Sequence, residues 1–307
     1  MLVFKEIELS DKPWVDACLR VKNSRMTEYC FTTLFMWAES YGTRIARYGD
    51  WLVVRSMHTD DGPVDYLFPA GSGDPAVPLQ ALVEDARQLG RPFRINCLTT
   101  EDLTHLEDWF PGMNWEVAPL RDSFDYIYHR EDLLHLRGKK YQAKRNFISR
   151  FLRNADWSYE RMDPTDSERC ARQLAECLQM NRQWCLENGC RHNQSLHQET
   201  CAGRKVLQHF QSLGLRGGIL RLNGEMVAYT IGEPLNEDTF IVHIEKAFSR
   251  IDGAYPMINR SFVEAESSGM LYINREDDAG QEGLRKAKLS YHPAFLQEKF
   301  TIVPVTD

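Results

Sequence analysis

The sequence predicts an α+β fold in two halves that repeat one order of helices and strands. Three observations support this prediction. Residues 1–125 alternate helix-like and strand-like stretches, a basic amphipathic stretch follows, and after residue 154 the alternation begins again without detectable sequence identity. We therefore expect domains at residues 1–132 and 155–307, joined by a linking helix at 133–154. Each domain is expected to hold a mixed, mostly antiparallel sheet flanked by helices.

The composition is typical of a soluble globular protein. The 307 residues are 43% apolar, enough for the core of one large or two ordinary domains. No window approaches the roughly 20 apolar residues that cross a bilayer, and the N-terminus lacks the layout of a signal peptide. We therefore expect a cytoplasmic protein without a transmembrane segment. The formal net charge of −7 argues against a general nucleic-acid coat protein.

The first half is expected to open with a helix capped by Asp11 and to continue with a hairpin. Gly49-Asp50 separates the strand-like residues 43–48 and 51–55, which is a two-residue hairpin signal. The remaining expected elements are a helix seam at 32–37, strands at 65–69, 93–98 and 125–128, and helices at 78–89 and 101–109.

The linking segment carries a strongly basic face. From Arg137 to Arg153 there are seven Lys or Arg residues and no acid, while Phe147, Ile148 and Phe151 recur at helical spacing. Without these seven charges the rest of the chain carries −14, so attraction within the protein explains part of the clustering. A phosphate-bearing partner explains it more directly, whereas a solvated helix face would show the same pattern.

The second half has its clearest signal at Asn223-Gly224. This pair separates the strand-like residues 218–222 and 226–232 and favours a tight hairpin. The other expected elements are helices at 166–188, 201–213, 255–267 and 284–291 and strands at 239–245, 270–274 and 299–305.

The eight cysteines include no C-x-x-C pair, which indicates reduced thiols. One run of cysteines and histidines suggests zinc, but its spacing matches none of the usual ligand patterns. We therefore expect no metal there. The run is Cys185, Cys190, His192, His197 and Cys201.

An abrupt change of charge marks residues 275–291, directly after the strand-like run 270–273. Desolvating an unpaired carboxylate beside a buried strand is costly. Either these groups pair with one another or they line a cleft that needs them. The acids are Glu276, Asp277, Asp278 and Glu282, and the bases are Arg285, Lys286 and Lys288.

The element order of the second half resembles the N-acyltransferase (GNAT) fold. In that fold a loop of the form Arg/Gln-x-x-Gly-x-Gly/Ala and a helix N-terminus hold a cofactor pyrophosphate. The equivalent stretch keeps Arg250 and Gly253 but places Tyr255 at the last small position. The resemblance implies a coenzyme A thioester as one candidate donor, and Tyr255 departs from the pattern at that point.

Several separated motifs resemble the phosphatidylglycerol lysyltransferase C-terminal domain family. They are His243-Ile244-Glu245-Lys246-Ala247; Gly253-Ala254-Tyr255 with Ile258-Asn259; Ile273-Asn274-Arg275-Glu276-Asp277 with Gly280; Glu282 to Lys288 with Ser290-Tyr291; and, in the linker, Leu136 to Tyr141 with Lys144-Arg145-Asn146. The resemblance implies tandem GNAT-like domains and a donor such as aminoacyl-tRNA. Characterised members pass the aminoacyl group to a lipid head group. We expect that acceptor not to carry over without a membrane-spanning half, so the acceptor stays open, and peripheral membrane contact stays an alternative.

Acyl transfer needs a base for the nucleophile, donors for the oxyanion and positive charge for a phosphate-rich donor. The candidate bases are His243, Glu245 and Glu276, with Tyr291 as a hydroxyl donor. A satisfied buried pair would explain His243 and Glu245 equally well. The candidates for binding substrate or phosphate are Lys139, Lys140, Lys144, Arg145, Lys246, Arg250, Gly253, Tyr255, Asn259, Asn274, Arg275, Arg285 and Lys288.

Three functions therefore compete. The first is an acyl- or aminoacyl-transferase that takes aminoacyl-tRNA or an acyl-coenzyme A as donor. The second is a binding module without catalysis, whose groove holds phosphate, a nucleotide or RNA with an affinity that falls steeply with salt. The third is coenzyme A-dependent acetylation of a small amine, which requires saturable coenzyme A binding.

Overall fold

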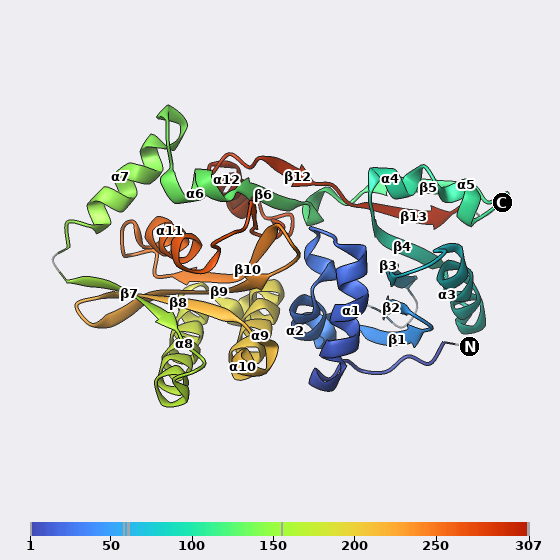
Figure 1. The fold of residues 1–307 in the computed structure, drawn as a ribbon, viewed down its shortest axis with the longest axis horizontal. Coiled ribbons are helices and arrows are strands. Elements are labelled where there is room, and N and C mark those ends of the chain that lie inside the picture. The colour runs from blue at the N-terminus through green and yellow to red at the C-terminus, as the bar shows by residue number, and fades with distance from the viewer. Residues whose placement is uncertain (1, 58, 60–61, 155, 306–307) are drawn as a thin grey trace. The chain divides into compact units, whose positions relative to one another are not determined.

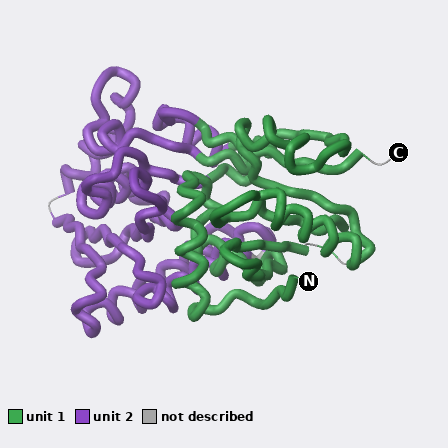
Figure 2. The backbone as a smooth tube through the Cα atoms, turned by 45° about the vertical axis from the view of Figure 1, so that its right-hand side comes forward, with its two compact units in different colours: residues 1–125, 277–282, 296–307 green, residues 126–276, 283–295 purple. Residues whose placement is uncertain are grey.

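The computed structural model forms two compact units, each built on one β-sheet (Figures 1 and 2). The described residues are 2–57, 59, 62–154 and 156–305. Unit 1 comprises residues 1–125, 277–282 and 296–307, and unit 2 comprises residues 126–276 and 283–295.

The sheet of unit 1 has the strand order β1-β2-β3-β4-β13-β5 among the described residues. Only β3 and β4 pair in parallel, and the other neighbours are antiparallel. The strands are β1 (Arg44–Tyr48), β2 (Trp51–Ser56), β3 (Val64–Gly71), β4 (Phe93–Leu98), β5 (Trp115–Pro119) and β13 (Phe300–Pro304).

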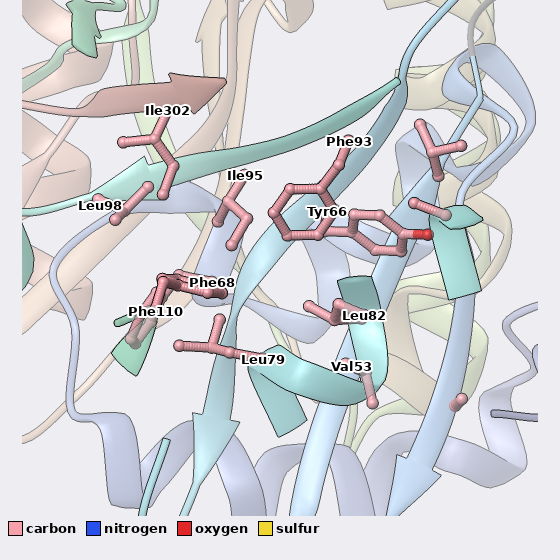
Figure 3. Close-up of a cluster of buried hydrophobic side chains, with 13 residues drawn as sticks. Val53, Tyr66, Phe68, Leu79, Leu82, Phe93, Ile95, Leu98, Phe110 and Ile302 are labelled. Atoms are coloured by element: carbon pink, nitrogen blue, oxygen red, sulfur yellow. The ribbon is translucent and has the colours of Figure 1, made fainter. Parts of the chain in front are cut away.

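The helices of unit 1 bury apolar stripes against this sheet. Leu79 and Leu82 of α3 are fully buried and lie against side chains of β3 and β4, including Tyr66 and Ile95 (Figure 3). Ile302 of β13 belongs to the same core, so the last strand contributes to the packing of the first unit. The helices are α1 (Lys12–Lys22), α2 (Phe31–Tyr41), α3 (Ala76–Leu89), α4 (Thr100–Leu103) and α5 (Leu106–Trp109).

The sheet of unit 2 has the order β12-β6-β11-β10-β9-β8-β7. Its strands β10 and β11 run parallel, whereas β11 pairs antiparallel with β6, and β10, β9, β8 and β7 form an antiparallel series. The strands are β6 (Asp125–His129), β7 (Trp157–Met162), β8 (Arg216–Leu222), β9 (Glu225–Pro234), β10 (Thr239–Ala247), β11 (Tyr272–Asn274) and β12 (Phe295–Gln297).

Helices cover both faces of this second sheet. In Figure 1, α11 lies above the central strands, and α8, α9 and α10 lie below them. The basic helix α7 packs against α11. The helices are α6 (Arg130–His135), α7 (Gln142–Phe151), α8 (Ser167–Glu187), α9 (Gln194–Gln208), α10 (Phe210–Leu213), α11 (Ala254–Glu266) and α12 (Glu282–Leu289).

Both predicted hairpins are confirmed. Gly49-Asp50 joins β1 to β2, and Asn223-Gly224 joins β8 to β9. Asn223 and Gly224 have φ angles of 52° and 79°, and this left-handed conformation at both central residues matches the right-handed twist of the flanking strands.

Other expectations about elements were wrong. The strand at 299–305 was expected to close the second half, but it is β13 and pairs in the sheet of unit 1. The strand at 125–128 was expected in the first half, but it is β6 and pairs with β11. The helix expected at 101–109 is two short helices, α4 and α5. The prediction of separate folding domains divided at residues 132 and 154 remains a prediction.

None of the helices in the described part of the chain is both long enough and apolar enough to span a bilayer.

Candidate active site

Two parallel strands bring the predicted catalytic residues to one edge of the unit 2 sheet. β10 and β11 pair with Phe240 opposite Ile273 and Ile241 opposite Asn274, so their carboxyl ends lie at the same edge. The ladder between β10 and β9 slips by one residue at His243, which is a β-bulge. The segment that follows β11 then places the next residues of the chain beside the end of β10.

His243 lies between two carboxylates. Its Nδ1 is 2.9 Å from Glu276 Oε1, its Nε2 is 3.1 Å from Glu233 Oε1, and its side chain is 0% exposed. An ionised carboxylate only accepts hydrogen bonds, so both ring nitrogens must donate when both acids are ionised. In this arrangement His243 has no ring nitrogen left to accept a proton from a substrate.

Glu245 and Arg275 form the second arrangement at this edge. Arg275 Nη2 donates to Glu245 Oε1 at 2.8 Å, and the Asn259 amide of α11 donates to Glu245 Oε2 at 2.8 Å. Each oxygen of the Glu245 carboxylate therefore has a fixed donor. We call Glu245, Asn259, Arg275 and the nearby Tyr291 the Glu–Arg cluster.

The Arg275 guanidinium is held over aromatic rings. Its Cζ lies 4.8 Å from the ring centre of Tyr291 and 5.7 Å from that of Tyr128. Burial by itself would lower the pKa of Arg275, but Glu245 more than offsets this effect, so the pKa lies above its usual range and the group stays charged. Among the described residues, the buried Nη1 of Arg275 has no hydrogen-bond partner. This N–H group is therefore not used within the described residues, although the guanidinium also acts on the buried Tyr291 hydroxyl, where it opposes the rise in that group's pKa.

Two further predicted residues, Asn274 and Lys288, support this edge. Asn274 is fully buried, and its side-chain oxygen accepts the Glu276 N–H at 2.6 Å. This bond holds Glu276 at a positive φ of 56°, a conformation that is uncommon for a residue other than glycine. The buried Lys288 ammonium donates to the Arg275 carbonyl at 2.6 Å. Arg285, on α12, is partly exposed.

Lys246 and Tyr255 contact another side chain, Trp184. The Lys246 ammonium lies 3.5 Å from the Trp184 ring centre and pairs with Glu199 at 2.9 Å. The Trp184 Nε1 donates to the Tyr255 hydroxyl at 3.3 Å. Arg250 pairs with Glu187 of α8 at 2.8 Å.

The loop before α11 packs against the basic helix. Gly253 has φ of 82°, and a Cβ atom built on it would lie 2.3 Å from the Phe147 carbonyl oxygen. Glycine is therefore required for close packing on α7. Asp252 of the same loop pairs with Arg150 at 2.7 Å.

The cations of the linking segment differ in their surroundings. Arg145 donates to the carbonyls of Leu136 and Gly138 and so ties α7 to the preceding turn. Lys140 lies 3.5 Å from Asp132. Lys139, in contrast, is exposed and makes no ion pair within the described residues.

The cysteine and histidine run does not gather into a cluster of metal-binding atoms. Within the described residues, no three ligand atoms of this run lie within 4.8 Å of one another. Cys201 Sγ and His197 Nδ1 are 3.9 Å apart, and Cys190 Sγ lies 3.5 Å from the Thr200 hydroxyl.

Sequence reasoning missed two residues at this edge, Glu233 and Tyr128. Glu233 is a buried acid at the end of a strand that otherwise reads as apolar. Its position in Ile-Gly-Glu-Pro is a signal of the same kind as the acids after β11. Tyr128 carries no comparable signal, because its contact with Arg275 depends on a distant segment of the chain.

These two mixed sheets flanked by helices define a tandem GNAT-like fold. A tandem GNAT protein from the clavulanic acid biosynthesis pathway has a similar fold, with a TM-score of 0.50 and 9% identity over 100% of both chains. A family model described as "Phosphatidylglycerol lysyltransferase, C-terminal" matches residues 20–303. The chain therefore belongs to this family.

Relatives show how widely the fold extends. A conserved protein of unknown function from Bacteroides thetaiotaomicron is 38% identical, with a TM-score of 0.90 over 99% of this chain and 100% of that one. The C-terminal domain of a putative lysylphosphatidylglycerol synthetase from Agrobacterium fabrum has a TM-score of 0.68 at 13% identity, over 95% and 92% of the two chains.

A curated relative, the uncharacterized protein MYCGA3080 of Mycoplasmoides gallisepticum, is 21% identical over 68% of this chain. The matched part spans 65% of that relative, which is less than two thirds of its length.

Proposed function

We propose that this protein is an aminoacyltransferase that moves an aminoacyl group from an aminoacyl-tRNA to an amine or hydroxyl acceptor. The observation that carries the proposal is the Arg275 guanidinium, fixed by Glu245 beside Tyr291 and with its Nη1 unused among the described residues, in a chain of the lysyltransferase family. Attack on the acyl carbonyl places negative charge on its oxygen, and a fixed buried N–H donor stabilises that charge. Glu245 holds the guanidinium in place for this role.

The loop before α11 supports tRNA over coenzyme A as the donor. A pyrophosphate needs several free N–H groups at the helix N-terminus. Here the Ala254 N–H already bonds to the Ile251 carbonyl, Pro256 has no N–H, and Gly253 packs on α7. This helix end therefore offers few donors to a pyrophosphate.

The linking segment supports a polyanionic donor. Arg137, Lys139 and Arg153 are exposed and form no ion pair within the part of the chain that the structure describes. Such cations contribute to binding a phosphate backbone through release of its counterions.

The test is a transfer assay with tRNA charged with a radiolabelled amino acid. Phosphatidylglycerol vesicles and small amines serve as separate acceptors, and acetyl-coenzyme A serves as the competing donor. We expect an aminoacyl product from the tRNA only. Arg275→Lys should lower the transfer rate by about 100- to 1000-fold, as for loss of an oxyanion donor. It should change the dissociation constant for tRNA by less than about threefold, because most of that affinity comes from contacts with the phosphate backbone.

The control is Arg172→Lys, an exposed arginine on α8 paired with Glu168, which should keep the wild-type rate. Salt-sensitive tRNA binding without a product from any acceptor would instead assign the protein to the binding modules. Saturable coenzyme A binding with acetyl transfer would replace the tRNA by a thioester donor.

A further inference from the structure

Lys144 differs from the other cations of the basic helix. Its side chain is half-buried, its ammonium donates to the Ser290 hydroxyl at 2.7 Å, and it lies 3.8 Å from the ring centre of Tyr291. It forms no ion pair with any carboxylate of the described residues. A phosphate-binding lysine is normally exposed, whereas Lys144 extends from α7 onto the Glu–Arg cluster.

The groups that face Lys144 come from three other segments. Arg275, after β11, contacts the same Tyr291 ring, and Glu245 of β10 pairs with Arg275. Ser290 and Tyr291, after α12, provide a hydroxyl and a ring face, neither of which is an anion at neutral pH. Partial desolvation and the fixed guanidinium, whose own carboxylate is already paired, disfavour the ammonium form, and they oppose the attraction of this cation to the face of the Tyr291 ring.

The pKa of the Lys144 side chain agrees with this geometry. Burial and the charge of Arg275 lower the pKa of Lys144 to about 8, and the charge of Glu245 opposes this shift. At pH 7 roughly a tenth of the molecules then carry a neutral amine at this position, compared with well under a thousandth for an ordinary lysine.

We infer that Lys144 is the general base of the proposed aminoacyl transfer. This inference rests on the proposed function. The acceptor O–H or N–H gives its proton to the neutral Lys144 amine as the new bond to the acyl carbon forms. The ester bond between the acyl carbon and the ribose oxygen then breaks, and the proton passes from Lys144 to that leaving oxygen. Atoms and charge balance without a further reactant.

Two of the three other candidate bases, Glu245 and His243, are less suited to this step. Both oxygens of Glu245 accept hydrogen bonds from Asn259 and Arg275, and both ring nitrogens of His243 face carboxylates. Among the described residues, the hydrogen-bond partner of the Lys144 ammonium is the neutral Ser290 hydroxyl.

The experiment measures both the titration and the transfer. Lysines of the full chain are reductively methylated with ¹³C-formaldehyde and followed by NMR against pH, and the resonance of Lys144 is the one that disappears in Lys144→Arg. We expect it to titrate near pH 8. Single-turnover transfer from aminoacyl-tRNA should rise with pH with the same apparent pKa.

Lys144→Arg keeps the positive charge but removes the base. It should lose about 100-fold in rate at pH 7.5 and lose the inflection near pH 8, with an unchanged dissociation constant for tRNA. Lys144→Ala should regain rate on addition of methylamine. The control is Lys286→Arg, an exposed lysine on α12, which should behave as wild type.

Each other outcome overturns the inference in a distinguishable way. If wild type transfers and Lys144→Arg keeps its rate and pH profile, the inference falls and the proposed function stands. A Lys144 resonance that titrates above pH 10 with the other lysines would also overturn the inference and leave the proposed function standing. If wild type transfers nothing from any aminoacyl-tRNA, the proposed function falls and the inference falls with it.

Discussion

A buried charge network in unit 1 shows how single residues set the pH response of this fold. The Lys299 ammonium lies 2.7 Å from Glu28 and 3.0 Å from Asp125, and the side chains of Lys299 and Asp125 are 0% exposed. Two carboxylates share one cation. Burial raises the pKa of Asp125 to about 6, with Lys299 opposing this shift and Glu28 adding to it.

Asp125→Asn should change the pH dependence of stability in a defined direction. The folded-state pKa lies above the unfolded value near 4, so between these values the folded state binds more protons than the unfolded state. The contribution of Asp125 to the free energy of unfolding is therefore present at low pH and is lost as the pH rises toward 6, by up to about 3 kcal/mol.

Urea denaturation at pH 4.5 and pH 7 measures this effect. The stability of wild type relative to Asp125→Asn should fall between pH 4.5 and 7. The exposed Glu116→Gln on β5 should show no such trend. A constant difference between wild type and Asp125→Asn would mean that Asp125 keeps an ordinary pKa.

The packing of Gly253 on α7 links two elements, the loop before α11 and the basic helix. Gly253→Ala introduces a Cβ atom 2.3 Å from the Phe147 carbonyl oxygen at a φ of 82°. We expect a loss of about 2–4 kcal/mol in the free energy of unfolding, from backbone strain and from the displaced helix. Thermal and chemical denaturation measure it.

Gly214→Ala is the matched control. Gly214 ends α10 with φ of 73°, and nothing lies within 4 Å of an added Cβ atom. This variant should lose only about 1 kcal/mol from the conformational strain. Equal losses at the two positions would show that the packing of Gly253 on Phe147 contributes little.

Elements set by local sequence were predictable, and elements set by distant partners were not. Asn223-Gly224 determines its hairpin because both residues adopt positive φ readily. β6 and β13 were predicted as strands but were assigned to the wrong half of the chain. No local sequence signal indicates which sheet a short strand joins.

The same reasoning applies to the candidate site. His243, Glu245, Arg275 and Glu276 stand out in the sequence as charged groups at strand ends, and their mutual contacts agree with that pattern. The position of Lys144 depends on where α7 lies relative to residues 290 and 291, more than a hundred positions later. Sequence reasoning therefore assigned Lys144 to the phosphate-binding residues, whereas its surroundings in the fold favour a role as a base.

Because of the net charge of the whole molecule, we expect any contact with tRNA to be confined to one group of cations. A net charge of −7 repels a polyanion, so binding has to come from a confined group of cations. Replacing Arg137, Lys139 and Arg153 together by Gln should weaken tRNA binding. It should also reduce the slope of log affinity against log salt by about one for each phosphate that is no longer neutralised. Filter binding between 50 and 200 mM salt, as an order-of-magnitude range, measures both.

The control for this prediction removes the same charge elsewhere. Arg20, Arg182 and Arg204 are exposed and form no ion pair in the described part of the chain. Their joint replacement by Gln should lower affinity slightly and leave the salt slope unchanged. If both triple variants behave alike, the linking segment is not a tRNA contact.

The place of β13 between β4 and β5 has a consequence for biosynthesis. The ribosome completes residues 300–304 only after it has synthesised all of unit 2, so until then one edge of β4 is open and β5 has no partner strand. Open edges invite pairing with other nascent chains. A product that stalls or terminates before residue 300 would therefore be prone to aggregate through its N-terminal part.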